Sequence, residues 1–150
     1  MINLNLPDSS RIWVYQSNRF FSNDEISFVQ NKLNGFIQGW NNHGKNLTAD
    51  ACVLSPSFII LAVNESDLNA SGCSIDSSVR FVKQIGEELN IDFFDRLKVL
   101  IEKDEEFKYV SIHTLTDYKD CKTFNTLVQT IGEFKNSFKI PVNQSPLFQI

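Results

Sequence analysis

One short segment of the sequence, NASGCSID, gathers side chains whose chemistry suggests a functional site. Cys73 stands at or just before the start of a stretch in which apolar residues recur at helical spacing. Free N–H groups and the dipole at a helix N-terminus stabilise a thiolate, so this cysteine is placed as a nucleophile would be. The neighbours that would form a binding site with it are Ser71, Gly72, Ser74 and Asp76. The segment predicts a nucleophile or an anion-binding site.

The same residues also fit a purely structural role. Small polar residues directly before a helix commonly cap its first turn, and Asp76 in that turn suits the dipole. Cysteine is, in addition, among the residues most often buried as a small hydrophobe. A structural cap therefore stays an alternative to a functional thiol.

A second chemical group, His43, follows the first expected helix. In a βαββαβ sheet, the loop after the first helix and the loop before the second lie at the same end. His43 would then approach Cys73, as a cysteine nucleophile and its base require. A histidine at the negative end of a helix is also a common capping residue, so this pairing depends on the fold.

Residues 39–46, GWNNHGKN, come within one residue of a nucleotide-binding signature, because Asn46 replaces the required Ser or Thr. A phosphate loop follows a strand and opens a helix, whose N-terminus binds the phosphates. Here the match lies at the expected C-terminal end of a helix, where the dipole repels phosphate. We therefore expect no P-loop ATPase.

Periodicity predicts the order of elements up to residue 90. A first strand covers 11–17, and a helix follows to about residue 41, with Ser22 and Glu25 forming a capping box at its start. Two strands are expected at 47–54 and 57–64, and a second helix at 74–90.

The C-terminal part is less regular. A hairpin is expected from 97–102 and 107–113, and a short helix at 131–138, whereas 123–129 fits either a strand or a helix. The whole chain, 1–150, is expected to be a single domain with irregular termini at 1–10 and 140–150. The order predicts an α+β fold, with a mostly antiparallel sheet of about five strands and two long helices on one face. This is a ferredoxin-like βαββαβ order with a short C-terminal extension.

Composition limits the classes of partner. The 150 residues include 14 basic and 18 acidic side chains, for a net charge of −4, which opposes nucleic acid as a partner. We find no signal peptide, no apolar stretch long enough to span a membrane, and no cofactor or metal motif. Three cysteines without paired spacing suit a reduced, cytoplasmic protein.

Several stretches resemble a small, uncharacterised bacterial protein family associated with the Bacteroidota. They are RIWVYQSNRFF at 11–21, the W-x-x-H-G pattern at 40–44, ASGCSIDSSVRFV at 70–82 and FFDR at 93–96. The resemblance covers most of 11–96 and returns at 124–141. Members of that family are often labelled "ABC transporter ATPase", but Walker and signature motifs are absent here. The resemblance implies no catalytic residues.

Three functional hypotheses follow. The leading one is a cytosolic domain that binds a small ligand or a protein partner, with the GCSID segment as its recognition site. The second is a thiol-dependent enzyme with Cys73 as nucleophile and His43 as base. The third is a self-associating protein, a homodimer in the simplest case, whose apolar tail at 146–148 docks on a second copy.

Overall fold

The computed structural model describes residues 2–148. Its elements follow in the order β1 (Arg11–Gln16), α1 (Asn23–Gly39), β2 (Asn41–Asn42), β3 (Lys45–Asn46), β4 (Thr48–Leu54), β5 (Phe58–Asn64), α2 (Gly72–Leu89), β6 (Lys98–Lys103), β7 (Glu106–Ser111), the 3₁₀ helix η1 (Ile112–Tyr118), β8 (Lys122–Phe124), α3 (Ile131–Ser137), β9 (Lys139–Pro141) and the 3₁₀ helix η2 (Val142–Gln144).

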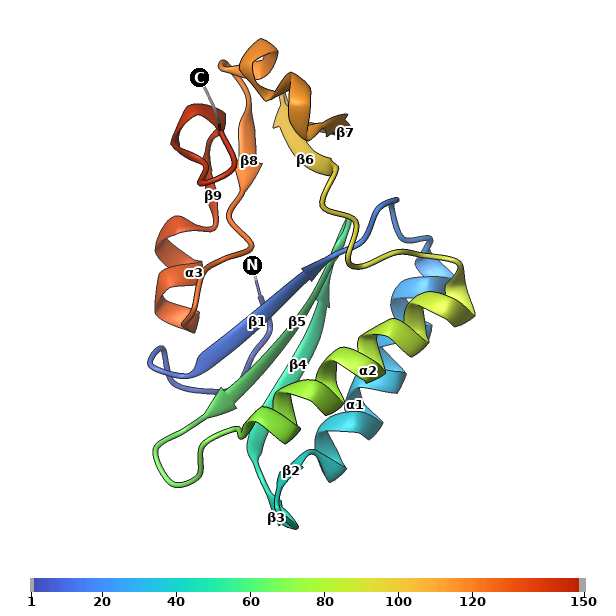
Figure 1. The fold of residues 1–150 in the computed structure, drawn as a ribbon, viewed down its shortest axis with the longest axis vertical. Coiled ribbons are helices and arrows are strands. Elements are labelled where there is room, and N and C mark those ends of the chain that lie inside the picture. The colour runs from blue at the N-terminus through green and yellow to red at the C-terminus, as the bar shows by residue number, and fades with distance from the viewer. Residues whose placement is uncertain (1, 149–150) are drawn as a thin grey trace.

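The N-terminal part forms a three-stranded antiparallel sheet in the order β1-β5-β4. Strand β5 lies in the centre because its sequence, FIILAVN, is almost continuously apolar, and its first six residues are buried. Helices α1 and α2 both cover one face of this sheet (Figure 1). Alternate residues of β5, including Ile59 and Leu61, pack under them with Val29 and Leu33 of α1 and Val82 of α2.

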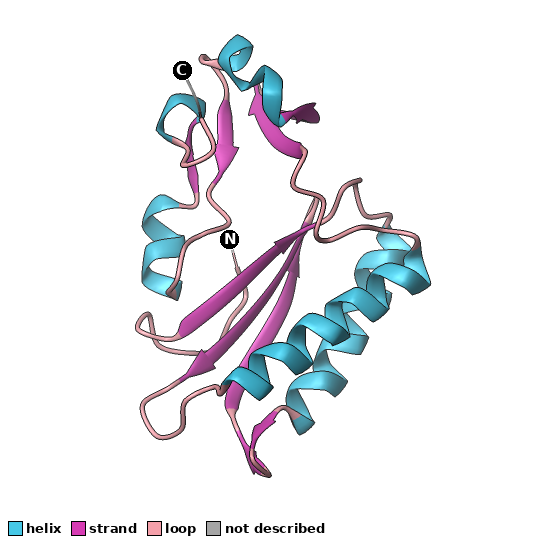
Figure 2. Ribbon diagram, in the orientation of Figure 1, coloured by secondary structure: helices cyan, strands magenta, loops and turns pink. Residues whose placement is uncertain are grey.

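The C-terminal part forms a second antiparallel sheet in the order β7-β6-β8-β9. Figure 2 shows its strands separated from those of the first sheet. A tight turn joins β6 to β7, and both of its central residues, Asp104 and Glu105, have positive φ. The 3₁₀ helices η1 and η2 pack on one face, around Ile101 and Val142.

A second core joins the two sheets. It buries the face of the first sheet that α1 and α2 leave free, through residues such as Ile12, Phe58 and Ile60. Leu100 of β6 and Phe134 of α3 pack against them. Figure 1 shows α3 on the same side of the molecule as β8 and β9. The two sheets are therefore joined by an apolar, Phe-rich layer.

The α+β class, the antiparallel pairing and the two helices on one face are confirmed. The expected single sheet is not, because β6 leaves the first sheet and pairs with β7 and β8. In a ferredoxin-like sheet, a fourth strand would pair with β1. Here β1 forms an isolated bridge at this edge, between Arg11 and Thr130.

Three local expectations need correction. The range 123–129 is neither a full strand nor a helix, since β8 ends at Phe124. Within 140–150, expected to be irregular, Ile140 and Pro141 belong to β9 and Val142–Gln144 form a 3₁₀ turn; residues 149–150 lie outside the described part of the chain. His113 lies in η1 rather than at the end of a strand.

Candidate functional site

The GCSID segment begins α2, and its serines are engaged in capping. Ser71 is the N-cap, and its Oγ accepts the backbone N–H of Ser74 at 3.1 Å. In return, Ser74 Oγ accepts the backbone N–H of Ser71 at 3.1 Å. This is a reciprocal capping box, which satisfies two of the free N–H groups that an anion would otherwise use.

Ser74 also joins α2 to the segment that follows α1. Its Oγ donates to the carbonyl oxygen of Asn41 at 2.7 Å, and its own carbonyl accepts the indole N–H of Trp40 at 2.8 Å. Ser74 is 1% exposed and Trp40 2%. The polar atoms of Ser74 are therefore all directed into the protein, and none faces a ligand.

Gly72, Cys73 and Asp76 are exposed at the start of α2. Gly72 is the first helical residue, and a Cβ added there would meet no atom within 4 Å. Its φ lies outside the left-handed region, so the conformational freedom of glycine is not used at this position. Cys73 is the second residue of the helix rather than a residue before it.

His43 does not cap a helix. Helix α1 ends at Gly39, and the chain continues through the hairpin of β2 and β3, in which His43 and Gly44 form the two-residue turn. Their φ angles are +51° and +85°, as a primed hairpin turn requires. The near match to a phosphate loop is thus a helix end followed by a hairpin, with no helix after Lys45 to bind phosphate.

Cys73 and His43 line the same hollow, which has a volume of about 330 Å³. The lining residues of this Cys73 hollow are Phe36, Gly39, Trp40, Asn41, His43, Cys73 and Ser77. The expected approach of the loop after α1 to the start of α2 therefore occurs. Among the described residues, however, no hydrogen bond joins the thiol to the imidazole.

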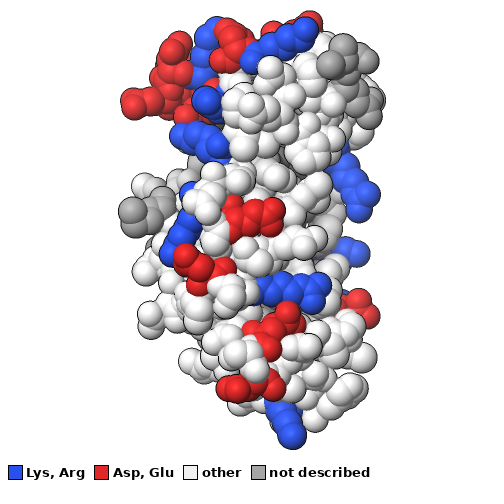
Figure 3. All heavy atoms as spheres, turned by 90° about the vertical axis from the view of Figure 1, so that its left-hand side faces the viewer, with Lys and Arg blue, Asp and Glu red and all other residues white. Residues whose placement is uncertain are grey.

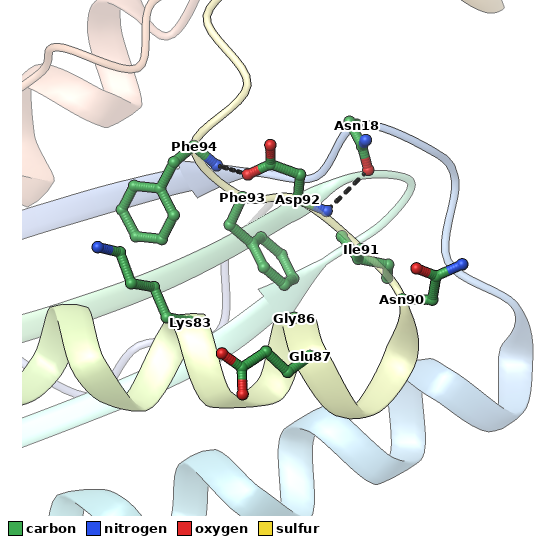
Figure 4. A pocket seen from close by; sticks show the side chains of 9 residues that line it. All are labelled: Asn18, Lys83, Gly86, Glu87, Asn90, Ile91, Asp92, Phe93 and Phe94. Carbon is green, nitrogen blue, oxygen red and sulfur yellow. Dashed lines mark hydrogen bonds between the residues drawn. The ribbon is translucent and has the colours of Figure 1, made fainter.

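A second hollow, of about 430 Å³, lies at the other end of α2 (Figure 4). The glycine at 86 is required there, because a Cβ would collide with the carbonyl oxygen of Ile91. Two hydrogen bonds of Asp92 lie at this hollow: its N–H donates to Asn18 Oδ1 at 3.0 Å, and its carboxylate accepts the N–H of Phe94 at 2.8 Å. These contacts fix the loop that leaves α2.

A larger cavity, with a volume of about 740 Å³, lies where the two sheets meet. We call it the aromatic cavity. Its lining residues are Ile2, Leu54, Ser55, Pro56, Phe58, Glu102, Phe107, Phe124, Phe134, Lys135, Asn136, Phe138 and Lys139. Five of these are phenylalanines, contributed by β5, β7, β8, α3 and the residue after α3. Its lining is more apolar than that of the Cys73 hollow or of the hollow at the end of α2.

The rings of the aromatic cavity form one connected cluster. Phe124 lies 5.3 Å from Phe58 and 5.3 Å from Phe138, measured between ring centroids, and 6.1 Å from Phe107. Phe134 stacks on Phe138 at 4.2 Å. These separations are typical of favourable aromatic pairs. Phe58, Phe134 and Phe138 are buried, whereas Phe107 and Phe124 are partly exposed toward the opening.

Charged groups lie at the rim of this cavity. Lys139 Nζ donates to Glu102 Oε2 at 2.8 Å, and Lys135 Nζ donates to Asp8 Oδ1 at 2.7 Å. The Glu102 side chain is 14% exposed, while both lysines are about half exposed. The cavity therefore combines an apolar interior with a few polar groups at its edge, as small-molecule sites commonly do.

Over residues 2–148, no group of three or more His, Cys, Asp or Glu side chains is arranged to hold a metal ion. No helix within that range has the length and apolar character to cross a bilayer.

On the face where α3 and β9 lie, acidic and basic side chains are interspersed, with no field of a single sign (Figure 3).

Comparison with known proteins adds no relative. No protein-family model, no curated protein and no solved structure matches this chain. The resemblance of residues 11–96 and 124–141 to a bacterial family stays a prediction, and the functional argument depends on the geometry of the sites.

Sequence reasoning missed the aromatic cavity because its lining residues are scattered from position 2 to position 139. The chain contains thirteen phenylalanines, and this number by itself predicts an apolar core rather than a cavity. The sequence did contain one local signal. Phe134 and Phe138 are four residues apart and each is followed by a lysine, which is typical of a short amphipathic helix with a charged end. This signal does not predict that the helix packs against β5 and β8.

Proposed function

We propose that this protein is a small-molecule-binding domain whose ligand occupies the aromatic cavity. The supporting observation is the Phe-lined opening of about 740 Å³ between two sheets. Ligand sites in proteins are clefts of roughly 300–1,000 Å³, largely apolar and formed before the ligand arrives. Two partly exposed rings, Phe107 and Phe124, offer apolar surface that an occupant would remove from water.

The proposal differs from the sequence-based choice of recognition site. The hydroxyl groups of Ser71 and Ser74 are already hydrogen-bonded, which lowers the capacity of the GCSID segment to bind an anion. The polar side chains at the rim of the aromatic cavity have donors to spare, because each lysine ammonium has three. A recognition role for Gly72 and Asp76 stays a prediction.

The test uses a neutral fluorescent probe, N-phenyl-1-naphthylamine, whose emission rises in an apolar site. Asn136 lines the opening and is exposed, so Asn136→Trp should obstruct the cavity without altering the core. We expect this variant to weaken probe binding about tenfold or more, a change of roughly 1.4 kcal/mol.

The matched control is Asn31→Trp, on the exposed surface of α1 and outside the cavity lining. It should bind the probe as the wild type does. Absence of binding to the wild type, or equal weakening by both tryptophans, would contradict the proposal.

A second candidate function, thiol chemistry at Cys73, is favoured by one specific observation. Cys73 is exposed and shares a hollow with His43, while Cys52 and Cys121 are buried. In this function the imidazole of His43 takes the thiol proton, and the sulfur adds to a carbonyl carbon of the substrate while the C=O π electrons move to the oxygen, which receives the proton from His43.

Alkylation of each cysteine, followed by mass spectrometry over a range of pH, tests this candidate. An activated thiol at Cys73 reacts at neutral pH faster than a free cysteine, and His43→Gln slows it. A rate equal to that of a free cysteine and unaffected by His43→Gln rejects the candidate.

A further inference from the structure

We propose that the ligand of the aromatic cavity is an amphipathic anion, with an apolar body among the phenylalanine rings and one anionic group at the lysine rim. This inference rests on the proposed function and names its ligand class.

The charges around the opening come from several of the elements that form it. Lys135 is contributed by α3, Lys139 by β9 and Glu102 by β6. Two further groups adjoin the rim: Asp8 binds Lys135, and Lys122 stands directly opposite Glu102 in the ladder between β6 and β8. Directly opposed residues share a face of a sheet, so Lys122 lies on the side of Glu102. The three ammonium groups outnumber the two carboxylates, although the whole chain carries a net charge of −4.

The rim lysines are free to bind an additional anion. Each of Lys135 and Lys139 donates one recorded hydrogen bond, and an ammonium group has three donors. The pair of Lys135 and Asp8 is about half exposed on both sides, and such surface pairs contribute little stability, so a ligand anion displaces Asp8 at low cost.

The alternative, a cationic ligand, would have to bind Glu102, and the environment of this carboxylate disfavours such binding. Its side chain is 14% exposed and already has an ammonium group 2.8 Å away. A ligand cation would have to compete with Lys139 for a carboxylate that is largely removed from solvent. An anion, in contrast, binds the outer side of the same lysine and leaves the pair with Glu102 intact.

The apolar interior of the cavity determines which kind of ligand body can bind. Phe124 lies between Phe107 and Phe58, and its partly exposed ring offers a face or an edge for stacking. Among residues 2–148, the charged side chains that line the cavity are the three at its rim. An aromatic or aliphatic body therefore enters toward Phe58, while its anionic group stays at the solvent side beside Lys135 and Lys139.

The experiment compares two probes that share one ring skeleton. 8-Anilino-1-naphthalenesulfonate carries a sulfonate, and N-phenyl-1-naphthylamine lacks it. The measured quantity is the ratio of their dissociation constants for the wild type and for two variants, Lys135→Gln and Lys139→Gln. Glutamine at 139 still donates to Glu102, so this carboxylate keeps a partner. The matched control, Lys45→Gln, removes an exposed charge from β3, outside the cavity lining.

We expect each rim variant to weaken binding of the sulfonate about threefold to fivefold relative to the neutral probe, and Lys45→Gln to leave the ratio unchanged. Higher salt should reduce the preference for the sulfonate. Suppose that the neutral probe binds and Asn136→Trp obstructs it, but that neither Lys135→Gln nor Lys139→Gln changes the ratio of the dissociation constants. The proposed anionic ligand class is then wrong, and the proposed binding function stands. If neither probe binds the wild type, both proposals fail.

Discussion

The Cys73 hollow and the aromatic cavity differ in what their polar and apolar groups already do. Beside the hollow, Ser71, Ser74 and Trp40 are joined by hydrogen bonds that hold the start of α2 against the end of α1. In the cavity, the rings of Phe107 and Phe124 remain partly exposed, and the rim lysines keep unused donors. Residues with reactive-looking chemistry can thus serve stability, while a site suited to binding arises from ordinary apolar residues.

The largest expected effect is a difference between the two regions in how much the loss of an aromatic side chain lowers the free energy of unfolding. Trp40→Ala removes a 2% exposed indole and its hydrogen bond to Ser74, and should lower the free energy of unfolding by about 3–5 kcal/mol. Phe124→Ala, at a partly exposed ring of the cavity, should cost about 1–2 kcal/mol, because less buried surface is lost. Urea unfolding of both variants measures the difference. Equal costs would mean that the cavity, too, is primarily structural.

A smaller effect tests the capping role of the GCSID segment. Ser71→Ala removes the acceptor for the Ser74 N–H and should lower the free energy of unfolding by about 1 kcal/mol. Ser66→Ala, in the exposed loop before α2, is the control and should change it little. If Ser71→Ala left stability unchanged, the serine would have to be explained by a ligand.

The two long helices offer a comparison in pH. The α1 capping box uses Glu25, whose pKa is lowered to about 2, first by its hydrogen bonds with Arg19 and also by the Ser22 N–H. The ordinary value is 4.5, so this stabilisation is complete above pH 4.5 and is lost as the pH falls toward 2. The α2 box, made of two serines, has no such dependence.

Unfolding of the wild type and of Glu25→Gln, measured from pH 7 to pH 3, checks this expectation. The wild type should be more stable by about 1 kcal/mol at pH 7, and the difference should shrink as the solution becomes acidic. A difference that stays constant over this range would contradict the assigned pKa.

The smallest effect concerns Gly72. Because an added Cβ meets open space and φ is not left-handed, Gly72→Ala should raise the free energy of unfolding by about 0.5 kcal/mol. The gain arises in the unfolded chain, which loses conformational freedom. Thermal unfolding measures it, and destabilisation would show that the position needs glycine after all.

The sequence predicted the first half of the fold well, since its signals there are local. Ser22 with Glu25 located the start of α1, and the continuous apolar run of β5 identified a central strand. The second half was less accessible. Strand β6 (Lys98–Lys103) was correctly predicted as a strand. Its own residues did not specify whether it would pair with β1 or with β8. Strand partners depend on contacts between distant segments.

The candidate site followed the same division. The proximity of His43 and Cys73 was predicted from topology, and both line one hollow. The turn conformation of His43 was missed, because helix C-termini and hairpins share the same His-Gly signal. The aromatic cavity had no contiguous motif, so only the arrangement of both sheets brought Phe58, Phe107 and Phe124 together.

The composition of the cavity wall also has a consequence for synthesis. Its residues extend from Ile2 to Lys139, so the N-terminal strands and helices can fold while the wall is still missing α3 and β9. A ligand of the proposed kind therefore binds only after residue 139 has been made. It adds its binding free energy to the contacts that α3 and β9 make with the other parts of the wall, and so protects that junction against opening and proteolysis.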